Sequence, residues 1–421
     1  MPPPREFLFS LDPVGIRLGL ERIQALVEAL DHPDRAYRSI VVAGTNGKGS
    51  VSAMTERGLR AAGYRTGRYT SPHLLHLEER FAIDGTDADG PVVDHAIARV
   101  QRAAGSLDGP PSYFEATTAA ALELFRAAQV DVAVLEVGLG GRLDATNVTT
   151  PVAAAITAVD FDHQQLLGDT LAAIAAEKAG VIKRGGLAVL GANAPIVDTV
   201  VADRCRTVGA ELVRATAGVE ARTWLEGDRT MLELRTPACD YGTLALGLRG
   251  RHQADNAVTA VRLLETLRAR SLFDVPEHAI RTAVEEVAWP GRLELVRADG
   301  YDVLIDGAHN AAGAAALAAY LAEAYGRRLP LVFGMMGDKD VAAVAGALTK
   351  VASIIVCTTP RNARALPAGD LAAIVVGSAP GRDVRVVDDP RAAVRIAAAH
   401  GSPVVVAGSL YLAGEVRADI S

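Results

Sequence analysis

Short apolar runs alternate with longer helix-like segments along most of this chain. From Ser39 onwards, the run SIVVA is followed by a helical pattern from about Lys48, and VDVAVLEV and VAAAITAV precede a further helix from about Thr170. Strands that alternate with helices in this way are typical of βαβ units around a parallel sheet. The pattern therefore predicts an α/β fold whose N-terminal part has a central, mainly parallel sheet.

The pattern changes twice further along the chain. Between about Leu187 and Leu248, short alternating segments such as TMLELRT and GTLALGL predict antiparallel hairpins at a sheet edge, and a long helix follows from about Gln253. After AWPGRLEL the strand and helix alternation restarts, with DVLIDG, LPLVFG, ASIIVCT and SPVVVAG as its strands. We therefore expect two domains, residues 1–289 and 290–421, of which the second is a doubly wound α/β domain.

Composition narrows the class of protein. Half of the 421 residues are hydrophobic but only 5% are aromatic, so Ala, Val, Leu and Ile must build a core that suits helices stacked on a buried sheet. The formal net charge of -7 argues against nucleic acid as the main partner. We see no targeting segment and no apolar run of membrane-spanning length, so we expect a cytoplasmic protein without a membrane partner.

The most informative stretch is VVAGTNGKGSVSAM, in which a strand, a glycine-rich turn and a helix follow one another. Backbone N–H groups and the positive end of the helix dipole converge in such a turn, and Lys48 adds a charge for the β- and γ-phosphates of a nucleotide. The common pattern G-x-x-x-x-G-K-[ST] fails at two positions, where Val42 and Gly49 stand. We still predict a phosphate site; the alternative is a glycine-rich turn with an exposed lysine.

Further candidates lie where predicted strands end. Glu136 ends the strand DVAVLEV, where a carboxylate can hold Mg²⁺ beside bound phosphates, and His163 follows the next strand, so both are expected at the same edge of the sheet. Their structural alternatives are turn capping for Glu136 and an ordinary hydrogen bond for His163. Taken alone, Ser71 reads as a loop residue and Lys178 as a solvated lysine at a helix end.

The second domain offers a similar strand end. DGAHN follows the strand DVLI, so Asp306, His309 and Asn310 stand where a helix opens. A carboxylate and an imidazole there suit contacts to a ribose and to phosphate oxygens, while helix capping by Asp306 or Asn310 is the alternative. Arg292, in PGRLE near the predicted domain junction, suits either a ligand contact or an ordinary interdomain ion pair.

Ten ordered stretches resemble the folylpolyglutamate synthases and dihydrofolate synthases of the Mur ligase superfamily. They are GTNGKGS, TSPHL with ERF, FEATT, EVGLGGRLDATN, DHQQLLGDT, EKAGVIK, RGRHQADNA, PGRLE, DGAHN and GDKD. Together they span nearly the whole chain, and the irregular phosphate loop is the usual form in this family. The resemblance implies an ATP-dependent ligase with an N-terminal P-loop NTPase-like domain and a C-terminal Rossmann-like α/β domain, with the nucleotide between them.

The resemblance also implies roles for particular residues. The residues expected to bind ATP are Asn46, Gly47, Lys48, Gly49, Ser50, Asn256, Arg292 and Asp306. The expected Mg²⁺ ligands are Ser71, Glu136 and His163. The expected contacts to dihydropteroate or a reduced folate are Ser112, Tyr113, Phe114, Glu115, Leu143, Asp144 and Ala145. The expected catalytic residues are Lys48, Lys178 and His309.

Lys178 matches a lysine that CO₂ carbamylates in this family. Carbamylation would turn a cation that repels Mg²⁺ into an anion able to bind a second one. His309 would contact the transferred phosphoryl group once the domains close. The implied cofactors are therefore ATP and Mg²⁺ at two sites, and K⁺ is a further candidate.

The implied reaction joins L-glutamate to dihydropteroate, to the γ-carboxylate of reduced folates, or to both, through an acyl phosphate. The enzyme is expected to be a monomer. One alternative is a Mur-type cell-wall ligase, but the 43 residues before Gly44 are too few for the nucleotide-sugar domain of those relatives. Another is a nucleotide-binding regulatory protein, which would bind ATP regardless of folates and release no phosphate on adding glutamate. Pocket shape decides the acceptor, so the sequence leaves it open.

Overall fold

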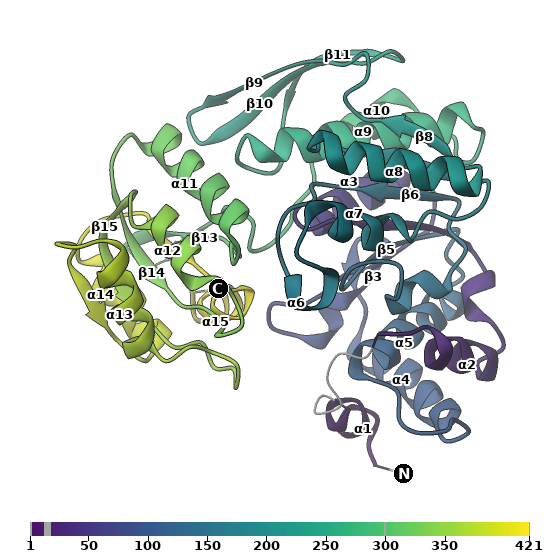
Figure 1. Cartoon of the computed structure of the whole chain (residues 1–421), viewed down its shortest axis with the longest axis horizontal. Helices are drawn as coiled ribbons and strands as arrows, with labels where there is room; N and C mark the ends of the chain where they lie inside the picture. Colours follow the sequence, from purple (N-terminus) through teal and green to yellow (C-terminus); the bar gives the residue numbers. More distant parts are fainter. Residues whose placement is uncertain (1, 12–17, 299, 421) are drawn as a thin grey trace. The chain divides into compact units, whose positions relative to one another are not determined.

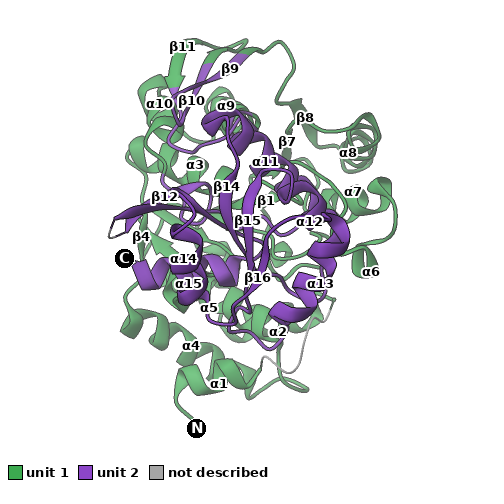
Figure 2. Ribbon diagram, turned by 90° about the vertical axis from the view of Figure 1, so that its left-hand side faces the viewer, with its two compact units in different colours: residues 1–221, 233–244, 255–287 green, residues 222–232, 245–254, 288–421 purple. Residues whose placement is uncertain are grey.

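Two large β-sheets flanked by helices organise this chain, as the computed structural model in Figure 1 shows. The structure describes residues 2–11, 18–298 and 300–420. The chain divides into two units, coloured separately in Figure 2. Unit 1 comprises residues 1–221, 233–244 and 255–287, and unit 2 comprises residues 222–232, 245–254 and 288–421.

Unit 1 is built on an eight-stranded sheet of order β4-β3-β2-β5-β1-β6-β7-β8. The six strands β2-β5-β1-β6-β7-β8, in that order across the sheet, pair in parallel. At one edge, β3 pairs antiparallel with both β2 and β4. The mainly parallel sheet that the sequence predicts is therefore confirmed. The strands are β1 Arg38–Ala43, β2 Thr66–Tyr69, β3 Phe81–Ile83, β4 Thr86–Asp87, β5 Val132–Glu136, β6 Ala153–Ile156, β7 Leu187–Leu190 and β8 Glu211–Arg214.

Helices cover this sheet because its central strands are apolar on both faces. Every residue of β5 is buried, as is every residue of β1 after the first. The helix pairs α3 with α10, α4 with α5, and α7 with α8 pack against each other. The helices are α1 Pro4–Ser10, α2 Glu21–Ala29, α3 Lys48–Ala61, α4 Gly90–Ala104, α5 Tyr113–Ala127, α6 Gln164–Leu167, α7 Leu171–Ala179, α8 Pro195–Val208, α9 His252–Ala269 and α10 Glu277–Glu285. The described connections also include the 3₁₀ turns η2 Pro33–Arg35, η3 Leu77–Arg80 and η4 Ala145–Val148.

The prediction of hairpins between residues 187 and 248 is wrong in its first half. There β7, α8 and β8 form another parallel βαβ unit of the main sheet. The buried residues of α8 are Val197, Val201 and Cys205, one per turn, and such a narrow apolar stripe is hard to distinguish from loop composition. Only the second half forms short consecutive strands, which make a separate three-stranded sheet of order β11-β10-β9. These are β9 Glu220–Glu226, β10 Arg229–Arg235 and β11 Asp240–Ala245.

Unit 2 contains a six-stranded sheet of order β12-β13-β17-β14-β15-β16. Only β12 runs antiparallel to its neighbour, so the second α/β series is confirmed. The strands are β12 Glu294–Ala298, β13 Tyr301–Ile305, β14 Leu329–Phe333, β15 Ala352–Cys357, β16 Val384–Val386 and β17 Val404–Ala407. The helices are α11 Ala311–Tyr325, α12 Val341–Leu348, α13 Ala368–Ser378, α14 Pro390–Ala398 and α15 Leu410–Ile420. Throughout the described residues, each helix is too short or too polar to cross a bilayer.

Candidate functional site

The phosphate loop connects β1 to α3, and two glycines allow its shape. Gly47 caps α3 with φ +87°, and a Cβ there would lie 2.2 Å from Oδ1 of Asn256. A Cβ on Gly44 would lie 1.9 Å from Oγ1 of Thr157. Neither position therefore accommodates a side chain, and the structure brings Asn256 to the loop, as the family motifs lead one to expect. The first turn of α3 consists of Lys48, Gly49 and Ser50.

The segment after β6 holds this loop in place. Oγ1 of Thr157 donates to the carbonyl of Asn46 at 2.7 Å, and the backbone N–H of Thr45 donates to the carbonyl of Ala158 at 2.7 Å. Oγ1 of Thr45 donates to the carbonyl of Asp160 at 2.9 Å. These bonds fix the loop backbone, so α3 presents its N-terminal N–H groups in a set direction.

Two lysine side chains meet at one carbonyl of the loop. Nζ of Lys48 donates to the carbonyls of Gly44 at 3.1 Å and Thr45 at 3.0 Å, and Nζ of Lys178 donates to that of Gly44 at 2.9 Å. Lys178 is only 3% exposed, so its interpretation as a solvated lysine is wrong. Burial, helped by the charge of Lys48, lowers the pKa of Lys178 to about 7. Near neutral pH, a large fraction of this amine is therefore uncharged.

Glu136 lies beside the phosphate loop, on the strand next to β1. The register pairs Val42 with Glu136, and Glu136 is 6% exposed. The backbone N–H of Ser71, two residues beyond β2, donates to Oε2 of Glu136 at 3.2 Å. The structure therefore brings these two predicted metal ligands together at the carboxyl ends of adjacent strands.

His163 lies seven residues beyond the end of β6, the strand on the other side of β1. The sequence reading placed Glu136 and His163 on consecutive neighbouring strands, but β1 lies between β5 and β6. His163 caps α6 with φ +53°, and its Nε2 lies 3.8 Å from Oδ1 of Asp162. Within the described part of the chain, no group of three His, Cys, Asp or Glu side chains is arranged to hold a metal. The predicted trio contains only two such residues, because Ser71 is its third member.

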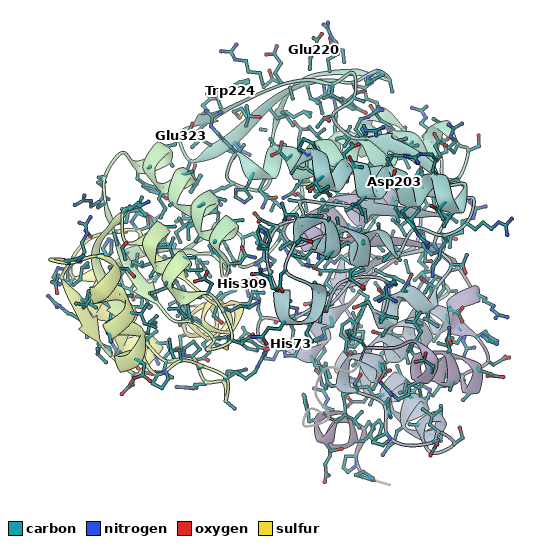
Figure 3. The ribbon with its side chains drawn as sticks, in the orientation of Figure 1. His73, Asp203, Glu220, Trp224, His309 and Glu323 are labelled. Atoms are coloured by element: carbon teal, nitrogen blue, oxygen red, sulfur yellow. The ribbon has the colours of Figure 1, made fainter. Side chains whose placement is uncertain are left out.

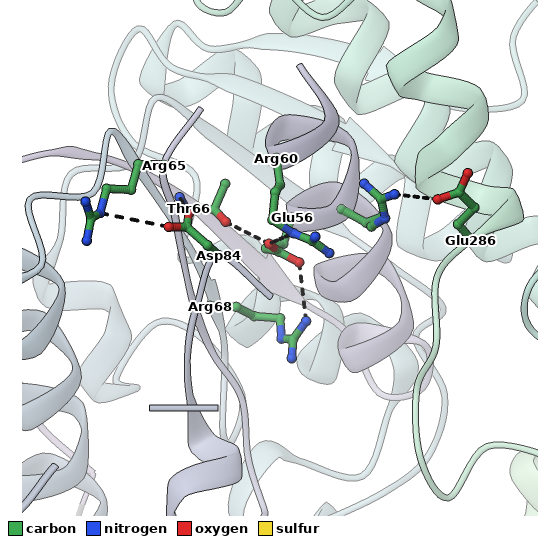
Figure 4. Close-up of polar contacts among 8 residues, drawn as sticks. Glu56, Arg60, Arg65, Thr66, Arg68, Asp84 and Glu286 are labelled. Atoms are coloured by element: carbon green, nitrogen blue, oxygen red, sulfur yellow. Dashed lines mark hydrogen bonds and ion pairs between the residues drawn. The ribbon is translucent and has the colours of Figure 1, made fainter. Parts of the chain in front are cut away.

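A buried carboxylate anchors α3 behind the loop (Figure 4). Glu56 is 1% exposed and accepts hydrogen bonds from Oγ1 of Thr66 at 2.7 Å and Nη1 of Arg68 at 3.4 Å. Both partners belong to β2, so this contact joins the helix to the sheet. On the outer side of α3, Arg57 forms an ion pair with the exposed Glu286.

The first predicted acceptor stretch opens α5. Oγ of Ser112 accepts the backbone N–H of Glu115 at 3.2 Å, and Oε2 of Glu115 accepts that of Ser112 at 2.7 Å, which makes a capping box. Glu115 also forms an ion pair with Arg22 at 3.2 Å. A Cβ on Gly138 would lie 2.5 Å from the ring of Phe114, so that ring packs on the glycine turn after β5.

The second predicted acceptor stretch holds the same turn. Asp144 is 4% exposed, and its Oδ2 accepts the backbone N–H of Leu139 at 2.9 Å. Burial raises the pKa of Asp144. Leu143 is half-buried and Ala145 is buried. The two stretches, far apart in sequence, therefore meet at residues 138–139.

In unit 2, Asp306 joins the PGRLE and DGAHN stretches. Its Oδ2 accepts the backbone N–H of Leu293 at 2.9 Å, and its Oδ1 accepts that of Ala308 at 2.8 Å. A Cβ on Gly307 would lie 2.5 Å from Nη1 of Arg292. Two of the residues expected to bind ATP, Arg292 and Asp306, therefore lie close together.

The helix-capping alternative is confirmed for Asn310, whose Oδ1 accepts the backbone N–H of Gly313 at 2.9 Å. Nδ1 of His309 lies 2.8 Å from the carbonyl of Gly307. The side chain of His309 is labelled in Figure 3.

The sequence prediction assigned no role to three residues that the structure places beside predicted site residues. Nε of Arg80 donates to Nδ1 of His73 at 2.8 Å, and the Arg80 guanidinium lies 5.3 Å from the ring centre of Tyr113. Burial lowers the pKa of His252, and the nearby charge of Asp306 acts in the opposite direction. All three belong to quoted motifs (TSPHL, ERF and HQADN), so motif membership was the available signal.

Comparison with known proteins identifies two matching families. The Mur ligase middle domain matches residues 42–264, and the Mur ligase glutamate ligase domain matches residues 291–410.

Similar proteins match over almost the whole chain. A folylpolyglutamate synthase of Lacticaseibacillus casei is 35% identical over 94% of this chain and 93% of its own. A probable bifunctional folylpolyglutamate synthase/dihydropteroate synthase of Haloferax volcanii is 36% identical over 98% of this chain, which spans about half (49%) of that relative's length. The structure of Mycobacterium tuberculosis folylpolyglutamate synthase complexed with ADP superposes with a TM-score of 0.91 at 35% identity, covering 98% of this chain and 96% of the other.

Proposed function

Because this chain belongs to the folylpolyglutamate synthase and dihydrofolate synthase family of the Mur ligases, we propose that it joins L-glutamate to dihydropteroate, to the γ-carboxylate of a reduced folate, or to both. ATP would supply the energy. The observation that carries this proposal is the loop at the end of β1, where Lys48 and the buried Lys178 meet beside Glu136.

The phosphates of ATP would lie at the N-terminus of α3. The loop from Asn46 to Ser50 supplies backbone N–H groups, and Lys48 can turn from the loop carbonyls to the β- and γ-phosphates because its side chain is long and flexible. The contacts assigned to Arg292, Asp306 and His309 rest on the family motifs and remain predictions.

The residues near the loop suit Mg²⁺ once Lys178 is modified. Glu136 and Ser71 offer the oxygen donors that Mg²⁺ prefers, and His163 offers a nitrogen. A charged Lys178 would oppose a metal here. Its neutral amine can attack the carbon of CO₂ and release a proton, which leaves an anionic carbamate. When bound, Mg²⁺ would stabilise the charge on the phosphoryl group in transfer. We assign no residue to K⁺.

The reaction would proceed in two steps. The acceptor carboxylate attacks the γ-phosphorus of ATP, the bond to the bridging oxygen breaks, and ADP leaves; the charge of Lys48 stabilises this transfer. The amino group of glutamate then attacks the acyl carbon, phosphate leaves, and the nitrogen loses its proton. Holding both reactants in place contributes on the order of 7 to 11 kcal/mol.

The acceptor would bind near the turn at residues 138–139, where the stretches 112–115 and 143–145 meet. Since Ser112, Glu115 and Asp144 hold the backbone there, their part is to shape the site. Phe114 offers a ring to the pteridine, and Tyr113 would contact the rest of the acceptor. We further propose a cytoplasmic monomer with residues 1–289 and 290–421 as its functional domains.

The test offers purified protein ATP, Mg²⁺ and L-glutamate with each acceptor in turn, and separates the products by mass. We expect the acceptor mass to rise by one glutamate residue, with one phosphate released per amide formed. Exposed Arg235 provides a control variant, Arg235→Gln, that should retain activity, whereas Lys48→Ala should not. Nucleotide binding without phosphate release would instead favour the regulatory protein.

A further inference from the structure

Arg80, the last residue of η3, is a buried cation. It is 7% exposed, its Nε donates to Nδ1 of His73 at 2.8 Å, and its guanidinium lies over the ring of Tyr113. Among the described residues, no carboxylate forms an ion pair with Arg80. Burial of a charge without a counter-charge is costly, so this arrangement is suited to an anion that arrives with a ligand.

The nearby carboxylates are already engaged with other donors. Glu79 accepts three backbone N–H groups of the preceding turn, at 2.6 to 3.0 Å. Glu78 forms an ion pair with Arg5 at 2.5 Å, and Asp144 accepts the N–H of Leu139. Each would have to give up these bonds to neutralise Arg80.

His73 orients the guanidinium without adding charge. Because an arginine Nε always donates, Nδ1 of His73 must accept, so the ring proton is on Nε2. An imidazole whose Nδ1 accepts a hydrogen bond has only one ring proton and is neutral, so His73 adds no charge here. The ring of Tyr113 stabilises the guanidinium from one face. The site therefore carries a single positive charge in a fixed plane.

We propose that Arg80 binds the α-carboxylate of a folate acceptor, the acid group that does not react. This inference rests on the proposed function. Tyr113, directly against Arg80, belongs to the stretch expected to bind the acceptor. The reacting carboxylate needs free lone pairs to attack phosphorus, whereas a planar guanidinium engages both oxygens of its partner. Dihydropteroate has one carboxylate and a folate has two, so Arg80 would favour folates.

The test compares two ligands that differ in one group, tetrahydrofolate and its α-carboxamide. Each is titrated into the full chain by calorimetry with Mg²⁺ and the non-hydrolysable β,γ-methylene analogue of ATP. We expect wild-type protein to bind the carboxamide about 10- to 100-fold more weakly, the usual range for a charged hydrogen-bond pair. Arg80→Gln should bind both ligands equally, at the wild-type affinity for the carboxamide. Arg80→Lys should retain part of the preference, because it keeps the charge but not the planar geometry.

Two controls separate binding from folding. Arg235→Gln, an exposed arginine paired with Asp240, should leave both affinities unchanged. Every variant must bind the nucleotide analogue as wild type does; if Arg80→Gln fails this check, Arg80→Lys decides. Wild-type protein that binds both ligands equally, or binds no tetrahydrofolate, overturns the inference, as does an Arg80 variant that weakens both equally. If wild-type protein ligates neither dihydropteroate nor tetrahydrofolate, the proposed function fails and the role of Arg80 with it.

Discussion

Lys178 should titrate near neutral pH. Its pKa is lowered to about 7 from 10.5 by burial and by the charge of Lys48. At pH 7 about half of this amine is neutral, compared with about one part in 3000 for an ordinary lysine. Only the neutral amine attacks CO₂, so burial prepares the Lys178 side chain for carbamylation.

The same shift makes stability depend on pH. Because the pKa is lower in the folded state, the unfolded chain binds more protons between pH 7 and 10.5, and the free energy of unfolding rises with pH over that range. Compared with a variant that lacks this amine, the buried Lys178 lowers the free energy of unfolding by about 5 kcal/mol below pH 7. This destabilisation disappears as the pH approaches 10.5. Lys178→Met should therefore stabilise unit 1 most at low pH.

Two measurements in CO₂-free buffer test this reasoning. The chain has only five lysines, so NMR of protein labelled with ¹³C at lysine Cε should resolve Lys178, assigned from its absence in Lys178→Met. Hydrogen exchange at the β5 amides measures the opening free energy, with Lys350→Met, at an exposed position, as the control. A Lys178 signal that titrates above pH 10, or a stabilisation by Lys178→Met that does not change with pH, would refute the argument. Added ¹³C-bicarbonate should then give a new carbamate signal in wild type only.

Three further substitutions test the site and its support. Gly47→Ala puts a side chain on a residue with a left-handed backbone, where Asn256 already fills the space. Nucleotide affinity measured by calorimetry should therefore fall at least tenfold, and an unchanged affinity would contradict the loop geometry. Glu56→Ala removes the carboxylate that faces the buried guanidinium of Arg68, so hydrogen exchange should show unit 1 destabilised by about 3 to 5 kcal/mol. The control Glu286→Ala, which breaks an exposed ion pair, should destabilise unit 1 by about 0.5 kcal/mol or less. Glu136→Gln should abolish phosphate release without changing the circular dichroism spectrum, and near-normal turnover would exclude Glu136 as a metal ligand.

Local patterns predicted the parts of this fold that local forces determine. The phosphate loop was predictable because a buried strand, obligatory glycines and a helix start follow one another within residues 38–61. The region around α8 was not, because its apolar stripe is one residue wide and the parallel pairing of β7 with β8 joins residues more than twenty positions apart. Strand order was also hidden, so β1 was not expected between β5 and β6.

In the candidate site too, features set by local sequence were predictable, and features set by long-range contacts were not. The strand-end position of Glu136 followed from periodicity, but the burial of Lys178 did not, because a separate turn covers its helix: a Cβ on Gly141 would lie 2.9 Å from the carbonyl of Lys178. Likewise, Arg80 contacts a ring 33 residues along the chain, in Tyr113. Contacts across the sequence decide which charged side chains lose their water.

The packing of Phe114 on Gly138 has a practical consequence for redesign. Gly138 is two residues beyond Glu136, so a larger side chain at position 114 would push on the backbone that positions that carboxylate, and a smaller one would leave this backbone unsupported. An engineer who wishes to change which acid this protein accepts should therefore leave Phe114 in place and diversify Tyr113, whose ring faces Arg80.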